Sequence, residues 1–165
     1  MQRFGVWGEE SIARIIAAGL ITCGIPFVQV RPPERCRMGD ALLVLTPNVI
    51  LPPDGKLIHV RYLLLPGDSP CPLIQADCAV SYGLSDRDSI TVSSLGEDRM
   101  VLSLQRELVT LPGYVLERQE FCLPKPLSLS TEQTLSVYGA LLMMGVRPSC
   151  LPDCLFGHEK EPGLI

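Results

Sequence analysis

The stretch that decides the fold of this chain reads Ile90-Thr-Val-Ser-Ser-Leu95, then Gly96-Glu-Asp98, then Arg99-Met-Val-Leu-Ser-Leu104. In the first and last of these runs, apolar side chains recur at alternate positions. A two-residue period indicates strands with one buried face, and the short Gly-Glu-Asp connection predicts a hairpin. We expect this hairpin to belong to an antiparallel meander over residues 89–123. The stretch carries no catalytic signature, so it informs about architecture rather than activity.

Upstream of the hairpin, the first thirty residues carry a strand–helix–strand pattern. Short apolar runs stand at residues 3–7 and 27–30, and the first of them ends at Gly8. The segment between them predicts a helix over about residues 9–23, because its apolar residues repeat at helical spacing. These residues are Ile12, Ile15, Ile16, Gly19, Leu20 and Cys23. Strand, helix and strand in so short a segment predict a βαβ unit with parallel strands.

Two further buried strands are expected at residues 41–45 and 57–65, which are nearly continuous apolar runs. Residues 80–82 extend from this half of the chain or bridge to the next. The proline-rich segment before residue 73 is the best candidate for a boundary. We therefore divide the chain into residues 1–72, an α/β half, and residues 73–146, a β-meander with a closing helix that forms one compact unit with the first half. An irregular tail is expected over residues 147–165.

The closing helix is predicted from a capping box, in which Ser130 and Gln133 satisfy backbone amides at the helix start reciprocally. Gly145 ends the helix. The expected inward stripe consists of Leu135, Tyr138, Gly139 and Leu142. The predicted fold class is α/β, with a Rossmann-like parallel N-terminal half (βαβ) followed by an antiparallel β-meander and a C-terminal helix.

Composition limits the classes of protein to which the chain can belong. Of its 165 residues, 47% are hydrophobic and 19% are charged, which excludes intrinsic disorder. The net charge is −4 without a basic block, so a nucleic-acid partner has no electrostatic support. The apolar runs are too short to span a membrane, and the first residues enter a strand without a signal peptide. We expect a cytoplasmic protein whose partner is a small molecule or another protein, and a homo-oligomer is compatible with the sequence.

The turn after the first strand reads Gly8-Glu9-Glu10-Ser-Ile-Ala13, at the position where parallel α/β sheets place ligands. A dinucleotide fingerprint would need glycine where Glu10 stands. The two carboxylates stabilise the helix start by about 0.3–1 kcal/mol each and would repel a pyrophosphate. A self-capped helix start is therefore the favoured interpretation, and any ligand here is expected to be neutral or cationic. The candidate ligand-binding residues are Gly8, Glu9, Glu10, Tyr82 and Arg106.

Other chemistries have weaker patterns. A metal site would draw on Cys150, Cys154 and His158, which are spaced four residues apart. Zinc ligands usually come in pairs on tight turns, and the seven cysteines include no CxxC, so we favour unpaired thiols and expect no metal or cofactor. A histidine base has only His59 and His158 as candidates, and His59 stands in an apolar strand pattern that predicts a core position. No catalytic residue is assigned.

The order of elements over residues 79–146 resembles the second half of the central domain of Mur ligases. The likeness lies in the run Ala79-Val-Ser-Tyr-Gly-Leu84, the hairpin strands after it and the helix that begins at Gln133. It implies the scaffold without the ligase, because the ATP-binding G-x-x-G-K-[ST] loop is absent from the chain. Four phrases also resemble a small group of proteins from Gram-positive spore-forming bacteria, which implies no activity; they are Tyr82-Gly83, Ser93-Ser94, Gln105-Arg106 and Gln119-Glu120-Phe121.

Three hypotheses about function follow from these observations. The first is a non-catalytic binding or interaction module on a degenerate Mur-ligase-like scaffold. The second is a small enzyme or nucleotide-binding protein that uses the turn after the first strand. A pocket that joins Glu10, Tyr82 and Arg106 would favour the second hypothesis. The third is a thiol or metal protein that uses the two cysteines and the histidine near the end of the chain.

Overall fold

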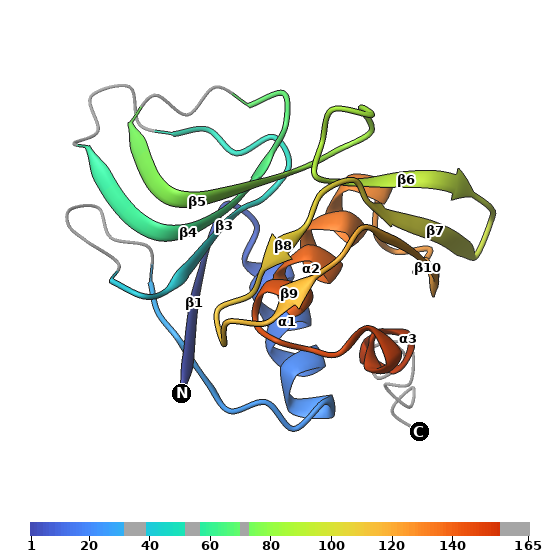
Figure 1. Ribbon diagram of the computed structural model, residues 1–165, viewed down its shortest axis with the longest axis horizontal. Helices are drawn as coiled ribbons and strands as arrows, with labels where there is room; N and C mark the ends of the chain where they lie inside the picture. Colours follow the sequence, from blue (N-terminus) through green and yellow to red (C-terminus); the bar gives the residue numbers. More distant parts are fainter. Residues whose placement is uncertain (32–38, 52–56, 70–72, 156–165) are drawn as a thin grey trace, which may run out of the picture.

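The computed structural model describes residues 1–31, 39–51, 57–69 and 73–155 (Figure 1). Its helices are α1 (Glu10–Thr22), α2 (Thr131–Met143), the 3₁₀ turn η1 (Pro148–Cys150) and α3 (Leu151–Cys154). Its strands are β1 (Gln2–Trp7), β2 (Phe27–Gln29), β3 (Leu42–Leu45), β4 (Ile58–Pro66), β5 (Ile74–Tyr82), β6 (Ile90–Leu95), β7 (Arg99–Leu104), β8 (Leu108–Val109), β9 (Val115–Leu116) and β10 (Gln119–Pro124).

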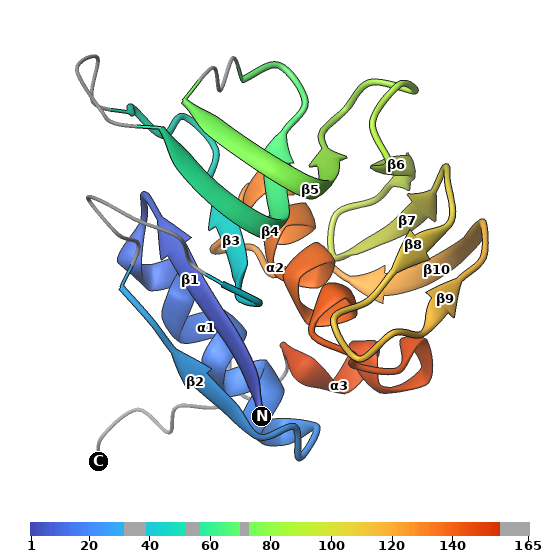
Figure 2. The same cartoon turned by 60° about the vertical axis from the view of Figure 1, so that its left-hand side comes forward.

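An eight-stranded sheet has the order β10-β7-β6-β5-β4-β3-β1-β2. The strands from β2 to β5 run parallel, and the sheet becomes antiparallel at β6, β7 and β10. One parallel pair, Tyr82 with Ile90, joins the two parts. β8 and β9 pair separately as a two-stranded ribbon. The fold is therefore α/β with a mostly parallel central sheet (Figure 2).

Most of the predicted elements are present, because their sequence patterns are local. α1 matches the predicted helix over residues 9–23 to within a residue at each end, and β1 and β2 flank it as a parallel pair. The hairpin of β6 and β7 forms, with a shift of the pairing register between Val92 and Ser94. Ser130 and Gln133 make both hydrogen bonds of the capping box, at 3.1 Å and 2.9 Å.

The structure differs from the sequence interpretation at β5. From the sequence, no strand is assigned to residues 73–79, and residues 80–82 are treated only as an extension of the first half or a bridge to the second, whereas β5 begins at Ile74 and pairs with β4 along its length. The sheet therefore continues across the predicted boundary. Residues 74–79 are half-buried or exposed, so they carry little of the apolar signal of a buried parallel strand. The β4–β5 connection, residues 67–73, is shorter than the roughly twelve residues of an ordinary parallel crossover, and both strands curve strongly in Figure 1.

α2 lies at the centre of the fold. It packs against β3, β4, β5 and β6 as well as against α1, and every residue from Thr134 to Met143 is buried. The predicted inward stripe is therefore too narrow. Additional cover comes from the segment after β8, where the N–H of Leu111 donates to the carbonyl of Met143 at 2.8 Å. Helical periodicity does not reveal such a helix, because a helix buried on all sides has no polar face.

The chain after α2 is more regular than the irregular tail expected over residues 147–165. η1 and α3 form there, and Leu151 is fully buried. Pro148 and Pro152 stand in the first turns of these elements, where a missing N–H removes no helical hydrogen bond. Residues 156–165, including His158 of the predicted metal set, lie outside the described residues.

Candidate functional site

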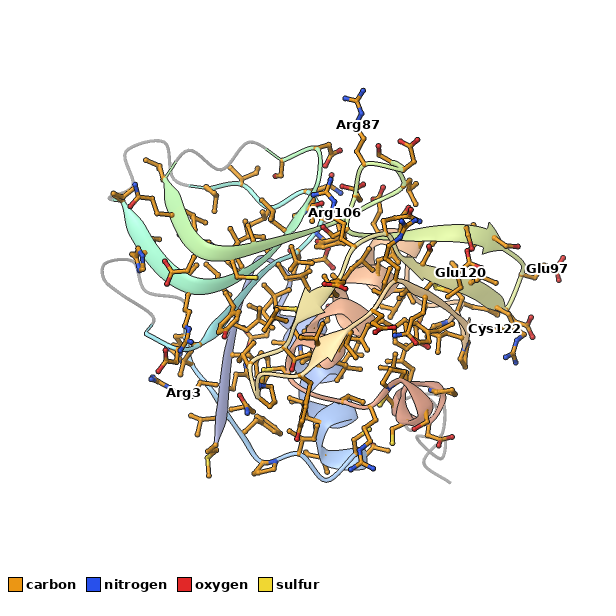
Figure 3. All side chains as sticks on the ribbon, viewed as in Figure 1. Arg3, Arg87, Glu97, Arg106, Glu120 and Cys122 are labelled. Carbon is orange, nitrogen blue, oxygen red and sulfur yellow. The ribbon has the colours of Figure 1, made fainter. Side chains whose placement is uncertain are left out.

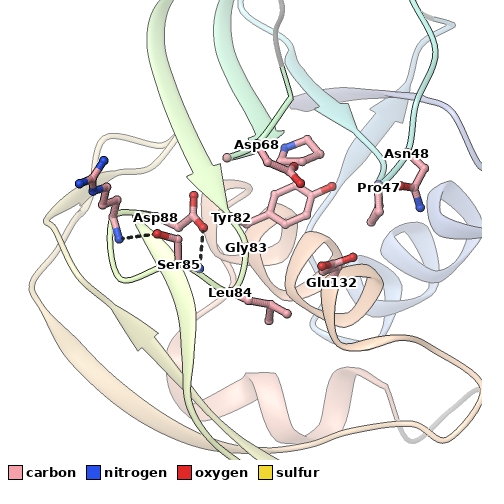
Figure 4. A pocket seen from close by; sticks show the side chains of 12 residues that line it. Pro47, Asn48, Asp68, Tyr82, Gly83, Leu84, Ser85, Asp88 and Glu132 are labelled. Carbon is pink, nitrogen blue, oxygen red and sulfur yellow. Dashed lines mark hydrogen bonds between the residues drawn. The ribbon is translucent and has the colours of Figure 1, made fainter.

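A cavity of about 400 Å³ lies at the carboxyl ends of β3, β4 and β5, beside the first turn of α2 (Figure 4). Parallel strands place their carboxyl ends at one edge of the sheet, which is where α/β proteins commonly bind ligands. Apolar side chains in the cavity wall are those of Pro47, Pro66 and Leu84. The charged residues that line it are Asp68, Arg87, Asp88 and Glu132.

Asp88 is the most buried charged residue of this cavity, with 6% of its surface exposed. Its Oδ2 accepts a hydrogen bond from the backbone N–H of Ser85 at 3.2 Å. The carboxyl group lies against Gly67 and Gly83, the residues that follow β4 and β5. A Cβ at Gly67 would overlap Oδ1 and lie 2.7 Å from Cγ, and a Cβ at Gly83 would overlap Oδ2. The two glycines therefore make room for a carboxylate at this edge of the sheet.

Tyr82, the last residue of β5, is fully buried and forms part of the cavity wall. Its hydroxyl donates to the carbonyl oxygen of Leu45 at 2.6 Å. Burial raises the pKa of Tyr82, and the negative charges of Glu132, Asp68 and Glu9 raise it further. The phenol therefore stays protonated at neutral pH, and its proton is already committed to Leu45.

The electrostatic character of the cavity is negative. Three of the described lining residues are carboxylates: Asp68, Asp88 and Glu132. None of the three forms an ion pair with another described residue. The guanidinium of Arg87 points outward from the molecule (Figure 3). Three of the four charged lining residues are therefore negative, and the three carboxylates are not paired with a described positive side chain.

On its β3 side, the turn after β1, which the sequence predicts as the ligand position, is occupied by Thr46. The strand order reverses here, because β2 lies on one side of β1 and β3 on the other. Thr46, directly after β3, is fully buried, and its Oγ1 accepts the backbone N–H of Glu9 at 3.1 Å. Gly8 has a φ of 125°, and a Cβ at this position would overlap Oγ1 of Thr46. An amide that a phosphate would use is thus already bonded.

Glu9 also connects the starts of α1 and α2. Its Oε2 accepts a hydrogen bond from Nε2 of Gln133 at 2.8 Å, while Oε1 of Gln133 accepts the N–H of Ser130. Glu9 is the N-cap residue of α1, but its side chain makes no capping hydrogen bond. The expected self-capping is wrong in this respect, because Gln133 of the neighbouring helix takes the carboxylate.

The predicted ligand-binding residues do not converge on one pocket. Tyr82 lines the cavity described above, whereas Gly8 and Glu10 line a second hollow of about 670 Å³. Arg106 is exposed, and its guanidinium donates to the carbonyl oxygen of Arg87 at 3.4 Å, on the loop after β5. The structure therefore places these predicted ligand-binding residues at separate positions on the protein.

Sequence reasoning did not identify the three carboxylates of the cavity. A partial signal exists for Asp68, because Gly67-Asp68 directly follows the apolar strand β4, and carboxyl ends of parallel strands meet at one edge. Asp88 and Glu132 come from a loop and from the first turn of a distant helix. Only the folded chain brings these two residues beside β4.

The structure also bears on two other hypotheses from the sequence, a metal site and a histidine that acts as a catalytic base. Among the described residues, no group of three His, Cys, Asp or Glu side chains is arranged to hold a metal ion. The prediction that His59 occupies the core is wrong. His59 is exposed on β4 and its Nε2 lies 3.2 Å from Oδ1 of Asp77, because alternate side chains of a strand point to opposite faces.

Comparison with known proteins assigns no family. No protein-family model matches the chain, and no curated protein matches it. The likeness to the Mur ligase central domain therefore stays a prediction. In the part of the chain that the structure describes, no helix combines the length and the apolar character needed to cross a membrane.

Proposed function

We propose that this protein is a non-catalytic binding module that takes a small organic cation, such as a polyamine, in the 400 Å³ cavity. The observation that carries the proposal is the position of Asp68, Asp88 and Glu132 around a cavity at the carboxyl ends of β3, β4 and β5. For the scaffold, we propose a Rossmann-like parallel half on a Mur-ligase-like core that lacks the ATP loop. The parallel β1–α1–β2 unit supports this reading of the scaffold.

A protonated amine suits the chemistry of the cavity. Ammonium groups donate several hydrogen bonds, and carboxylates accept them in charge-assisted pairs. Asp88 is 6% exposed and contributes its negative charge from the wall, whereas the more exposed Asp68 and Glu132 can meet a ligand directly. Pro47, Pro66 and Leu84 provide apolar surface against which the methylene groups of an alkyl amine can pack. The cavity therefore matches a molecule with charged ends and an apolar stem.

The second hypothesis, a nucleotide-binding protein or small enzyme at the turn after β1, has less support. Thr46 bonds the amide of Glu9. In the neighbouring hollow the carboxylate of Glu10 offsets the positive charge of Arg31, so the charged lining has no net positive charge to hold a phosphate. Catalysis in the cavity would need a nucleophile with a base in hydrogen-bond reach. The described lining residues include no histidine or cysteine, and Oγ of Ser85 accepts a backbone N–H.

The proposal is tested by isothermal titration calorimetry with spermidine and, separately, with ATP–magnesium at low ionic strength. We expect spermidine to bind and ATP not to bind. Asp68→Asn and Glu132→Gln should each weaken spermidine binding roughly three- to tenfold, because each removes one charge-assisted contact that solvent partly screens. Glu97→Gln is the matched control. Glu97 is an exposed carboxylate between β6 and β7, away from the cavity (Figure 3), and its replacement should leave the affinity unchanged.

Two outcomes would contradict the proposal. Equal spermidine affinity in the wild type, Asp68→Asn and Glu132→Gln would mean that the carboxylates take no part in binding. Micromolar binding of ATP by the wild type would favour the nucleotide hypothesis instead. Raising the salt concentration should weaken spermidine binding, because screening acts on charges in a solvent-accessible cavity.

A further inference from the structure

Away from the cavity, the structure brings together two cysteines that are distant in the sequence. Sγ of Cys23, at the end of α1, lies 2.8 Å from Sγ of Cys154 in α3, although 131 positions separate the two residues. We propose that this pair is a redox modification site, at which Cys23 and Cys154 form a reversible disulfide bond by exchange with a low-molecular-weight disulfide such as glutathione disulfide. The proposal does not depend on the cation-binding function.

The packing of α1 against α3 holds the two thiols in contact. A Cβ at Gly19 of α1 would lie 3.5 Å from Cβ of Cys154 and 2.9 Å from Cδ2 of Leu141, so glycine at this position allows the close approach of α3. Gly24, with a φ of 67°, ends α1 directly after Cys23. The packing of α1 and α3 therefore holds the two sulfurs in contact.

The two thiols differ in exposure, and this difference determines which of them reacts first with the incoming disulfide. Cys23 is half-buried, whereas Cys154 is 1% exposed. Burial raises the pKa of the Cys154 thiol, and its hydrogen bond with Cys23 raises it further. Because the thiolate is the attacking species, Cys23 is the thiol that reacts with the incoming disulfide, and Cys154 is the resolving thiol.

The exchange takes place in two steps. The Cys23 thiolate attacks one sulfur of glutathione disulfide, forms a mixed disulfide and releases the first glutathione thiolate. Cys154 then loses its proton and attacks Sγ of Cys23, which forms the protein disulfide and releases the second glutathione thiolate. The two thiol protons of the protein pass to the two released glutathiones. The protein thiols are oxidised, glutathione disulfide is reduced, and the reverse reaction restores the thiols.

Cys150 is the competing partner within reach of this pair. Sγ of Cys154 donates to the carbonyl oxygen of Cys150 at 3.3 Å, and Cys150 is half-buried at the end of η1. The sulfur contact that the structure shows for Cys154 is with Cys23, which favours Cys23 as its partner. The consequence for the fold also differs. A bond to Cys23 would close a loop over most of the chain and fix α3 on α1, whereas a bond to Cys150 would close only a few residues.

Oxidation should therefore raise the midpoint of thermal unfolding by about 10 °C, because a cross-link over so long a loop removes much of the freedom of the unfolded chain. The full chain is equilibrated in glutathione buffers of increasing oxidising strength, and its free thiols are alkylated and counted by mass spectrometry. Digestion with trypsin and with a protease that cuts before Asp153 separates Cys154 from Cys150. We expect two thiols to disappear together and a linked pair of peptides that contains Cys23 and Cys154.

The variants separate this proposal from its alternatives. Cys23→Ser and Cys154→Ser should each abolish the linked peptides and the rise of the unfolding midpoint, whereas Cys150→Ser and the exposed Cys122→Ser should keep both. If Cys154→Ser fails to fold, Cys23→Ser at a half-buried position gives the same readout. A Cys150–Cys154 link, a link to any other cysteine, or retention of all seven free thiols in the oxidising buffer would overturn the proposal.

Discussion

Replacing Gly67 with alanine tests how the candidate cavity is built. The new Cβ would overlap Oδ1 of Asp88 and lie 2.7 Å from its Cγ. The backbone of Gly67 is not in the left-handed region, so the overlap rather than backbone strain decides the outcome. The Asp88 carboxyl group must move, and its hydrogen bond from the N–H of Ser85, now 3.2 Å long, is lost or weakened.

Two effects determine how much Gly67→Ala lowers the free energy of unfolding. Overpacking typically destabilises a folded protein by about 1–3 kcal/mol, and loss of a hydrogen bond to a charged group by about 1.5–3 kcal/mol. Since Gly67 itself is exposed and its surroundings relax, we expect Gly67→Ala to lower the free energy of unfolding by about 2–4 kcal/mol. In an Asp88→Ala background both terms vanish, so the same change should cost less than about 1 kcal/mol. The expected coupling between the two sites is therefore about 1–3 kcal/mol.

Chemical denaturation of the wild type, the two single variants and the double variant measures this coupling. Gly96→Ala is the control, because the nearest atom to its Cβ is the carbonyl oxygen of Arg99 at 3.4 Å, and it should change stability by less than about 0.5 kcal/mol. A Gly67→Ala effect of equal size with and without the Asp88 carboxyl group would refute the reasoning, since the overlap would then lie elsewhere.

Two further predictions concern the core. Leu142→Ala in α2 should destabilise the protein by about 2–5 kcal/mol, because the buried methyl groups are lost and a cavity is left behind. Leu127→Ala, at an 81% exposed position, is the control and should leave the stability nearly unchanged. An unchanged denaturation midpoint for Leu142→Ala would contradict the packing of α2. Burial raises the pKa values of Tyr82 and Tyr138 above their unfolded value of about 10, so the stability they contribute is complete below about pH 10 and is lost as the pH rises further, by up to about 1.4 kcal/mol per pH unit for each group. Tyr138→Phe should reduce this alkaline loss and the 65% exposed Tyr114→Phe should not, and equal pH profiles in denaturation experiments would disprove the assignment.

The elements that could be predicted from the sequence are those whose signals lie within a few residues. The alternation in β6 and β7 and the helical spacing in α1 each arise from one buried face, so the pattern and the structure agree. The capping box of Ser130 and Gln133 is a local hydrogen-bond exchange and forms as expected. β5 lacks such a signal, because its first residues are only half-buried on one side and exposed on the other.

Features that depend on neighbours from distant parts of the chain could not be predicted. α2 is buried all round because the sheet, α1 and the segment after β8 surround it, and none of these contacts leaves a period in its sequence. The contact between Cys23 and Cys154 arises in the same way, from the packing of α3 on α1. The sequence shows seven cysteines without indicating which of them meet.

The displacement of the candidate site from its predicted position has a topological cause. In α/β sheets a ligand crevice opens where the strand order reverses, which in this chain lies between β1 and β3. Here Thr46 fills that crevice and Gly8 permits its approach, so no open backbone amide remains for a phosphate at Glu9. The open edge begins with the next strands, where Gly67 and Gly83 leave space that the Asp88 carboxylate occupies. The carboxyl-end edge of the sheet therefore carries negative charge beside β4 and β5, where we propose that a cation binds.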